Sequence, residues 1–289
     1  MDQALLDSAR YKISMLSLDS RFADKYYDGT ADYQMRLHST AKNIMRIALS
    51  SVEIPNVELL FTERHGTINF AWRLVPSTTW IDATIPAGNY TADELAAVIQ
   101  TALGVNFTVV VSPTSGLMTI TNTLSGGTQF EFRGTSPIGR ISERPKYWGI
   151  GYYMGFRTKE VTSDAGGVLT GTSIVLVQDA PYYLIQLEVP SAVTPLTQRL
   201  WDNGWIGAFA KVVLRDGAYT VEFDDGGNML RKENTFLAPV NIQAIRVRIV
   251  DPFGDTVNLR DMDWSMTLEM YEVVNSRVYS VISETYGRN

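Results

Sequence analysis

Residues 85–122, IPAGNYTADELAAVIQTALGVNFTVVVSPTSGLMTITN, contain the clearest helix pattern in this chain. Thr91 and Glu94 have the spacing of a capping box, in which the hydroxyl covers an N–H of the first turn and the glutamate reaches back to the cap. Gly104 is suited to the left-handed conformation that ends a helix. The sequence therefore predicts a helix from Ala92 to Leu103. Its apolar side chains recur with the spacing of one helix face, at Leu95, Val98, Ile99, Ala102 and Leu103.

The residues on either side of this predicted helix have β patterns. Thr79–Ile85 alternates as a strand before it, and Asn106–Val111 and Leu117–Asn122 follow it as two short strands. The Ser-Pro-Thr-Ser-Gly sequence between these two is rich in turn-forming residues, which indicates a hairpin. This module, at about residues 79–133, carries no candidate catalytic side chain. We interpret it as a small strand-helix-hairpin insertion in a β protein.

Composition excludes several classes of function. The chain has 289 residues, enough for one elaborated β domain or two modest ones, and its net charge of −6 gives no basic surface for direct contact with nucleic acid. It has no cysteine, and therefore no disulfide, thiolate nucleophile or cysteine metal ligand. No 18-residue apolar run occurs, and Asp2 and Asp7 lie where a signal peptide would be basic and apolar. We expect a soluble, non-secreted protein without a membrane span or a cofactor.

Most of the remaining chain consists of short alternating runs separated by turn residues, which predicts a sandwich or barrel. Asp216-Gly217 and the Asp-Asp-Gly-Gly sequence at 224–227 indicate hairpin turns. The connections after Val189 and Asp224 are long, as in jelly-roll topologies. We therefore predict a mainly β fold, a jelly-roll β-sandwich with the insertion described above. The predicted strands are Ile13–Leu18, Asn43–Ile54, Thr67–Leu74, Gln129–Phe132, Ser173–Gln178, Tyr182–Val189, Ile206–Leu214, Tyr219–Phe223, Ile242–Val250 and Trp264–Val274.

The domain layout that follows has three parts. Residues 1–18 form an N-terminal arm and the first strand, residues 19–274 form the jelly-roll domain with its inserted module, and residues 275–289 form a C-terminal arm. Met1–Lys12 and Asn275–Asn289 lack a clear pattern. We expect these two segments to become ordered only against neighbouring proteins.

A search for chemistry in the sequence finds no catalytic site. The two histidines, His38 and His65, are expected at the surface, and no G-x-S-x-G, H-E-x-x-H or P-loop spacing is present. Two acid pairs, Asp224 with Asp225 and Asp261 with Asp263, could serve a glycosidase, but both lie in turn sequences. Asp224, Asp225 and Asn228 are a weak candidate for calcium, since the twelve-residue EF-hand pattern is absent. We expect no catalytic, cofactor-binding or metal residues.

Aromatic residues are the remaining candidates for an interaction site. Tyr147, Trp148, Tyr152 and Tyr153 lie in a glycine-spaced cluster, YWGIGYYMGF. Such a cluster is typical of a protein-protein interface, and it could also form the platform of a carbohydrate-binding site.

Seven stretches, taken in order, carry a resemblance to a known family. The stretches are Asp19-Ser-Arg21 with its polar loop, IMRIALSSVEIPN at Ile44–Asn56, IPAGNYTADELAAVI at Ile85–Ile99, MTITN at Met118–Asn122, YMGFR at Tyr153–Arg157, YYLIQLE at Tyr182–Glu188 and IRVRIVDPFGDTVN at Ile245–Asn258. They resemble the jelly-roll penton and minor capsid proteins of large icosahedral double-stranded DNA viruses of the nucleocytoplasmic type. The resemblance spans about residues 19–274, and the order of the stretches is more specific than any one of them.

This resemblance implies a structural virion protein without catalytic residues, a penton component at the five-fold vertex of the capsid. It implies a homopentamer whose partners are the major capsid protein and other minor capsid proteins, assembled in the host cell, in the cytoplasm. A minor capsid protein between major capsomers is the first alternative. A carbohydrate-binding or glycosidase β-sandwich and a trimeric tail or baseplate component are the others.

Overall fold

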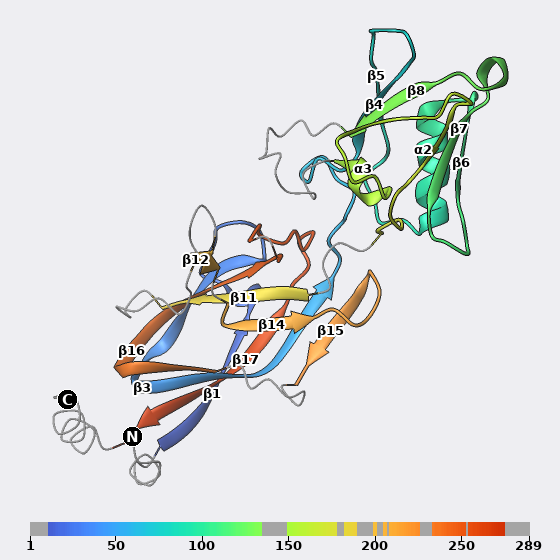
Figure 1. The fold of residues 1–289 in the computed structure, drawn as a ribbon. Coiled ribbons are helices and arrows are strands. Elements are labelled where there is room, and N and C mark those ends of the chain that lie inside the picture. The colour runs from blue at the N-terminus through green and yellow to red at the C-terminus, as the bar shows by residue number, and fades with distance from the viewer. Residues whose placement is uncertain are drawn as a thin grey trace, which may run out of the picture. The chain divides into compact units, whose positions relative to one another are not determined.

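The chain is mainly β, as the sequence predicts, and it divides into two compact units (Figure 1). Unit 1 combines Met1–Glu58 with Ala180–Asn289, and unit 2 is Leu59–Asp179. Unit 2 is thus inserted in the sequence of unit 1, and it extends beyond the expected 79–133 module on both sides. This computed structural model describes residues 11–134, 149–177, 182–189, 199–200, 205–206, 208–225, 233–252 and 254–274.

Unit 1 is built on one antiparallel sheet with the order β1-β17-β3-β16-β11-β14, in which β2 and β15 also pair with β3. Neighbouring strands come from distant parts of the sequence, as in a jelly roll. Its strands are β1 (Tyr11–Asp19), β2 (Lys25–Tyr26), β3 (Asp32–Asn56), β11 (Tyr182–Glu188), β14 (Ala210–Val213), β15 (Thr220–Asp224), β16 (Glu233–Val250) and β17 (Ser265–Val273), with a 3-10 turn η1 (Ser20–Phe22) and a separate pair, β12 (Arg199–Leu200) and β13 (Trp205–Ile206).

The two longest strands, β3 and β16, carry the curl of this sheet. Asn43 has a positive φ of 54° within β3, and its backbone N–H donates to Asn241 Oδ1 at 3.1 Å. The register between the two strands shifts three times between Thr235 and Ala244. Such irregularities bend a strand and re-aim its side chains. The curled sheet consequently encloses one core, whose buried members include Leu18, Ile47, Ile185, Val212, Val247 and Leu268.

A largely buried ion pair links β3 and β16. Asp32 accepts two hydrogen bonds of 2.8 Å from Arg246 Nε and Nη2. The Asp32 side chain is 5% exposed, and the guanidinium lies 4.0 Å from the ring centroid of Tyr27. The hydrogen bond to Asp32 raises the pKa of Arg246, which stays charged. A carboxylate buried to this degree depends on its partner, so this pair constrains the β3–β16 register.

Unit 2 has two small antiparallel sheets and the predicted helix. It has a core of its own, with Phe61, Phe70, Ile120, Phe132 and Tyr153 among the buried members. One sheet has the order β5-β4-β8-β9 and the other β10-β7-β6. The elements are β4 (Asn69–Leu74), β5 (Ile81–Thr84), α2 (Ala92–Leu103), β6 (Phe107–Val111), β7 (Met118–Asn122), η2 (Leu124–Gly126), β8 (Phe130–Gly134), α3 (Ile150–Tyr153), β9 (Glu160–Thr162) and β10 (Val168–Thr170).

Helix α2 begins and ends at the predicted residues. The capping box is formed: the Glu94 N–H donates to Thr91 Oγ1 at 3.3 Å, and the Thr91 N–H donates to Glu94 Oε2 at 2.8 Å. The backbone hydrogen bond from Thr91 to the carboxylate, followed by that from the Thr91 hydroxyl, lowers the pKa of Glu94. Gly104 ends the helix with φ 96° and ψ −179°, a glycine conformation that differs from the predicted left-handed one.

The buried face of α2 is rotated slightly from the prediction. Leu95, Ile99 and Leu103 are buried as expected, together with Ala96. Val98 and Ala102 are only half-buried, at the margin of the core. The reason is that apolar spacing indicates which stripe is hydrophobic, whereas the packing of α2 on β6 decides which residues lie at its centre.

Several predicted strands and turns are wrong. Ser173–Val177 forms no strand, because its backbone bonds go to loops and turns, for example Val175 N–H to Gly116 O at 2.9 Å. Asp216-Gly217 does not turn a hairpin, since β14 pairs with β11 whereas β15 pairs with β3. For the same reason the Asp-Asp-Gly-Gly sequence does not join a paired β15 and β16, both of which pair with β3.

The two expected arms are only partly described. Tyr11 and Lys12, assigned by the sequence to the N-terminal arm, are strand residues of β1 paired with Val273 and Glu272. The correction follows from partners more than 250 residues away, which local pattern cannot supply. The rest of the expected arms, residues 1–10 and 275–289, lies outside the described residues. No helix in the described part of the chain is long and apolar enough to cross a membrane.

Candidate interaction surfaces

The aromatic cluster does not form the expected exposed platform. Tyr153 is completely buried, and its ring packs edge-on against Phe61 with centroids 5.6 Å apart. The prediction of Tyr153 as an interface residue is therefore wrong, because glycine spacing in this segment serves close packing in the core of unit 2. Tyr152 is half-buried and stacks under the Arg157 guanidinium at 4.4 Å. Tyr147 and Trp148 lie outside the described residues.

The acidic candidates remain separate turn and strand residues. Asp224 ends β15 opposite Val52, and Asp225 is exposed beside it. Asp263 accepts a 2.7 Å hydrogen bond from Ser20 Oγ, which ties it to η1. Asp261 is exposed and has a positive φ of 60°. In the residues that the structure describes, no group of three or more histidine, cysteine and carboxylate side chains could hold a metal, and Asn228 lies outside them.

The histidines lie in different settings. His65 is half-buried in a turn, where its backbone N–H donates to Thr62 Oγ1 at 3.2 Å, so the expectation of a surface residue is wrong for it. His38 is exposed, as expected, on the N-terminal half of β3. It lines an open groove in unit 1.

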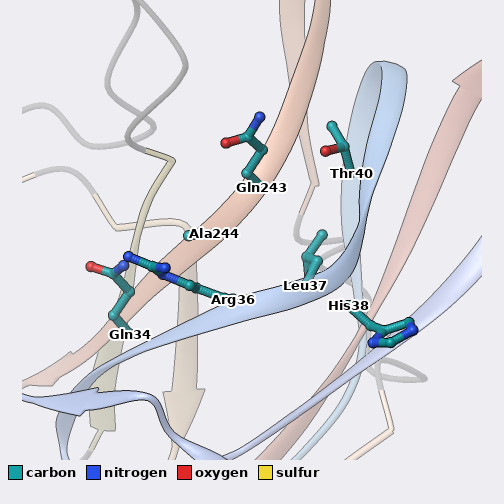
Figure 2. Close-up of a pocket in the computed structure, with 7 residues that line it drawn as sticks. All are labelled: Gln34, Arg36, Leu37, His38, Thr40, Gln243 and Ala244. Atoms are coloured by element: carbon teal, nitrogen blue, oxygen red, sulfur yellow. The ribbon is translucent and has the colours of Figure 1, made fainter.

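Two open grooves of unit 1 share the same segment of β3. The first has a volume of about 590 Å³ and lies between β3 and β16. The second, of about 550 Å³, lies between the same segment of β3 and the strands β1 and β17. Figure 2 shows the lining of the first groove: Gln34, Arg36, Leu37, His38, Thr40, Gln243 and Ala244.

The polar groups of this groove do not converge on one point. Figure 2 shows the Arg36 side chain extended toward Gln34, whereas the His38 ring points away from both. Thr40 and Gln243 lie at a third position. A catalytic site needs an acid, base or nucleophile within hydrogen-bond reach of its partner. The labelled side chains therefore form no such pair in this groove, and the groove was not predicted from the sequence.

Two rows of apolar side chains point outward from edge strands of unit 1. On β1, Ile13 and Met15 are 56% and 63% exposed. At β15, Tyr219, Val221 and Phe223 alternate along the chain and are 59%, 58% and 62% exposed. β1 ends the sheet, and among the described strands β15 pairs with β3 alone. Contiguous apolar rows on a soluble β protein usually mark sites of protein-protein contact.

Comparison with known proteins finds similarity among solved structures. No protein-family model matches the chain, and a search of curated proteins finds no significant match. Among solved structures, the chain is similar to the crystal structure of a selenomethionine-labelled mavirus penton protein, with a TM-score of 0.49 and 11% sequence identity. That similarity covers 91% of this chain and 100% of the other.

Proposed function

We propose that this chain is a structural protein of a viral capsid and that five copies form a penton at the vertex of an icosahedral shell. The sequence resemblance supports the proposal, because its stretches fall on ordered parts of the fold. Ile44–Asn56 is the second half of β3, Ile85–Ile99 leads into α2, and Tyr182–Glu188 is β11. A jelly-roll sandwich with an inserted unit is the architecture that the resemblance implies.

The outward apolar row at β15 is the observation that carries the proposal. Val221 and Phe223 expose large apolar side chains on β15, and Tyr219 does so in the turn just before it, where a monomeric protein would usually place charges or proline. When one patch of a subunit binds a different patch of the next, the contact repeats until the rotation closes a ring. We assign the β15 row to one side of such a contact and the Ile13 and Met15 row of β1 to the other.

The state of assembly tests this proposal. The mass of the chain should be measured by analytical ultracentrifugation from about 1 to about 100 μM, because assembly depends on protomer concentration. We expect pentamers, and we expect the double variant Val221→Glu, Phe223→Glu to be monomeric. Val105→Glu is the matched control, since Val105 is 98% exposed in unit 2. A trimer would instead favour the tail or baseplate alternative.

The position in a virion gives the second test. Cryo-microscopy of particles that contain this chain should show its density on the five-fold axes, in contact with the major capsid protein. Density between major capsomers would make it a minor capsid protein. Absence of the chain from purified particles would refute the virion role.

We also propose that the chain is not an enzyme. Of the acid pairs considered for a glycosidase, Asp224 is the last residue of β15, Asp261 lies in a turn, and Asp263 is engaged by Ser20. Panels of glycosidase and esterase substrates should show no turnover. Turnover that disappears in Asp263→Asn while the fold is retained would contradict the proposal.

A further inference from the structure

The shared segment of the two grooves lacks regular strand partners. In the register of β3 with β16, Arg36 lies opposite Ala244 and Ala41 opposite Ile242, so the four residues Leu37–Thr40 face Gln243 alone. On the other edge of β3, the pairing with β2 ends at Gln34, and the pairing with β17 begins at Ile44. Backbone N–H and C=O groups need hydrogen-bond partners. Within the described strands, Leu37–Thr40 is therefore an open edge in the middle of a long strand.

The second groove, between β3 and the strands β1 and β17, has an apolar floor. Leu16, Met35 and Leu37 are half-buried and pack on the core of unit 1. Ile44 and Met270, which also line the groove, are buried members of that core. An extended chain laid on the open edge would place every second side chain on this floor.

The rim of the groove is cationic, although the whole chain has a net charge of −6. Lys12, Arg36 and Lys42 line it together with His38, and among the described residues of its lining the one acid is Glu272. Glu272 Oε2 lies 3.6 Å from Lys12 Nζ, so its charge is already matched. The exposed Arg36 and Lys42 side chains thus give this surface a local positive charge. A segment that carries carboxylates would be electrostatically complementary to it.

We propose that the second groove, between β3 and the strands β1 and β17, binds an extended, acidic peptide segment of a partner protein. This segment adds a strand to β3 at Leu37–Thr40. Backbone hydrogen bonds to the open edge would give the affinity, as in other cases of strand addition. Alternate side chains of the segment would lie on the apolar floor, and its carboxylates would face Arg36 and Lys42. This inference goes beyond the capsid proposal, because it rests on the groove alone and holds for any oligomeric state.

A designed peptide tests the charge and the backbone separately. The probe is an acetylated, amidated and fluorescently labelled octapeptide, Glu-Val-Glu-Thr-Glu-Val-Glu-Thr, and its binding to the full chain is followed by fluorescence anisotropy. We expect saturable binding whose affinity falls as the salt concentration is raised from about 50 to about 200 mM, because salt screens the attraction between exposed charges. The double variant Arg36→Glu, Lys42→Glu should weaken binding at least about tenfold. Lys159→Glu, an exposed charge reversal in unit 2, should leave the affinity within about twofold.

A second peptide, N-methylated at alternate residues, keeps the charges and removes the N–H groups that would pair with β3. It should lose at least about tenfold in affinity if a strand is added. Amide hydrogen exchange in Leu37–Thr40 should slow when the unmodified peptide binds. Absence of saturable binding up to about 1 mM would overturn the inference. So would equal binding of the N-methylated peptide, or equal or tighter binding of an oligothymidine of the same charge, since either shows a site for anions in general.

Discussion

Replacing Ile99 by alanine would show which face of α2 is buried. The Ile99 side chain is completely buried, so the substitution removes about three carbon groups from the core and leaves a cavity. Burial is worth about 0.8 kcal/mol per carbon group, and with the cavity we expect a loss of about 3 kcal/mol. Val98→Ala is the matched control on the same helix. Val98 is half-buried, and alanine is the better helix former, so we expect a loss of no more than about 0.5 kcal/mol.

Amide hydrogen exchange measured by mass spectrometry can follow this effect in unit 2 separately. A loss of about 3 kcal/mol should reduce the protection of peptides from Leu59–Asp179 by about a hundredfold. Peptides from β3 and β16 provide an internal reference, because those strands belong to the core of unit 1. Equal effects of Val98→Ala and Ile99→Ala would refute the assigned face of the helix. No effect of Ile99→Ala would refute the packing of α2 altogether.

Three further predictions concern unit 1. Arg246→Met should destabilise it by about 3 kcal/mol in urea unfolding, because it leaves the Asp32 carboxylate buried without its main partner; no measurable loss would contradict the described pairing. Asn43→Gly should be neutral or stabilising, whereas Asn43→Val should cost about 1–2 kcal/mol, because a β-branched residue disfavours the positive φ; a tolerated valine would show that the bend is absent. The hydrogen bond from the Arg21 side chain lowers the pKa of Asp19 in the folded protein. The ionised Asp19 side chain therefore stabilises the fold above its unfolded pKa, and this stabilisation is lost as the pH falls through its folded pKa. Carboxyl NMR titration should show that Arg21→Ala raises the Asp19 pKa, and an unchanged pKa would contradict this cause.

The sequence predicted those parts of the fold that depend on local chemistry. The bounds of α2 followed from a cap and a spacing that lie within thirteen residues of one another, and both are formed. The mainly β character followed from alternation along each strand. The face of α2 was less certain for a physical reason: Ala96 is small enough to approach the sheet closely, and its small side chain gives little signal in an apolar pattern.

The pairing of the strands could not be predicted from local sequence patterns. Asp216-Gly217 correctly marks a change of direction, but turn residues do not determine which strand the chain meets next. β15 pairs with β3, more than 150 residues earlier in the sequence, and β14 pairs with β11. The interface candidates failed in a related way. Tyr153 belongs to a segment whose composition is typical of a surface aromatic cluster. Its ring is nevertheless buried against Phe61, which lies far away in the sequence.

The segment of β3 that lines both grooves has a signal in the sequence, which becomes clear only when the register of β3 with β16 is known. Arg36–Asn43 is a mostly polar run between two apolar halves of one strand, and the strand predicted from the sequence begins only at its last residue, Asn43. In the structure it is the bend of β3, where a strand that contributes to both halves of the curled sheet leaves its regular pairing with β16. The same irregularity closes the sandwich and leaves Leu37–Thr40 without regular partners. Polar side chains are suited to such a segment, because a backbone without regular strand partners can bond to water or to another chain. The curl of the sheet and the open edge therefore have one physical cause, and a mutation that straightens β3 should remove both.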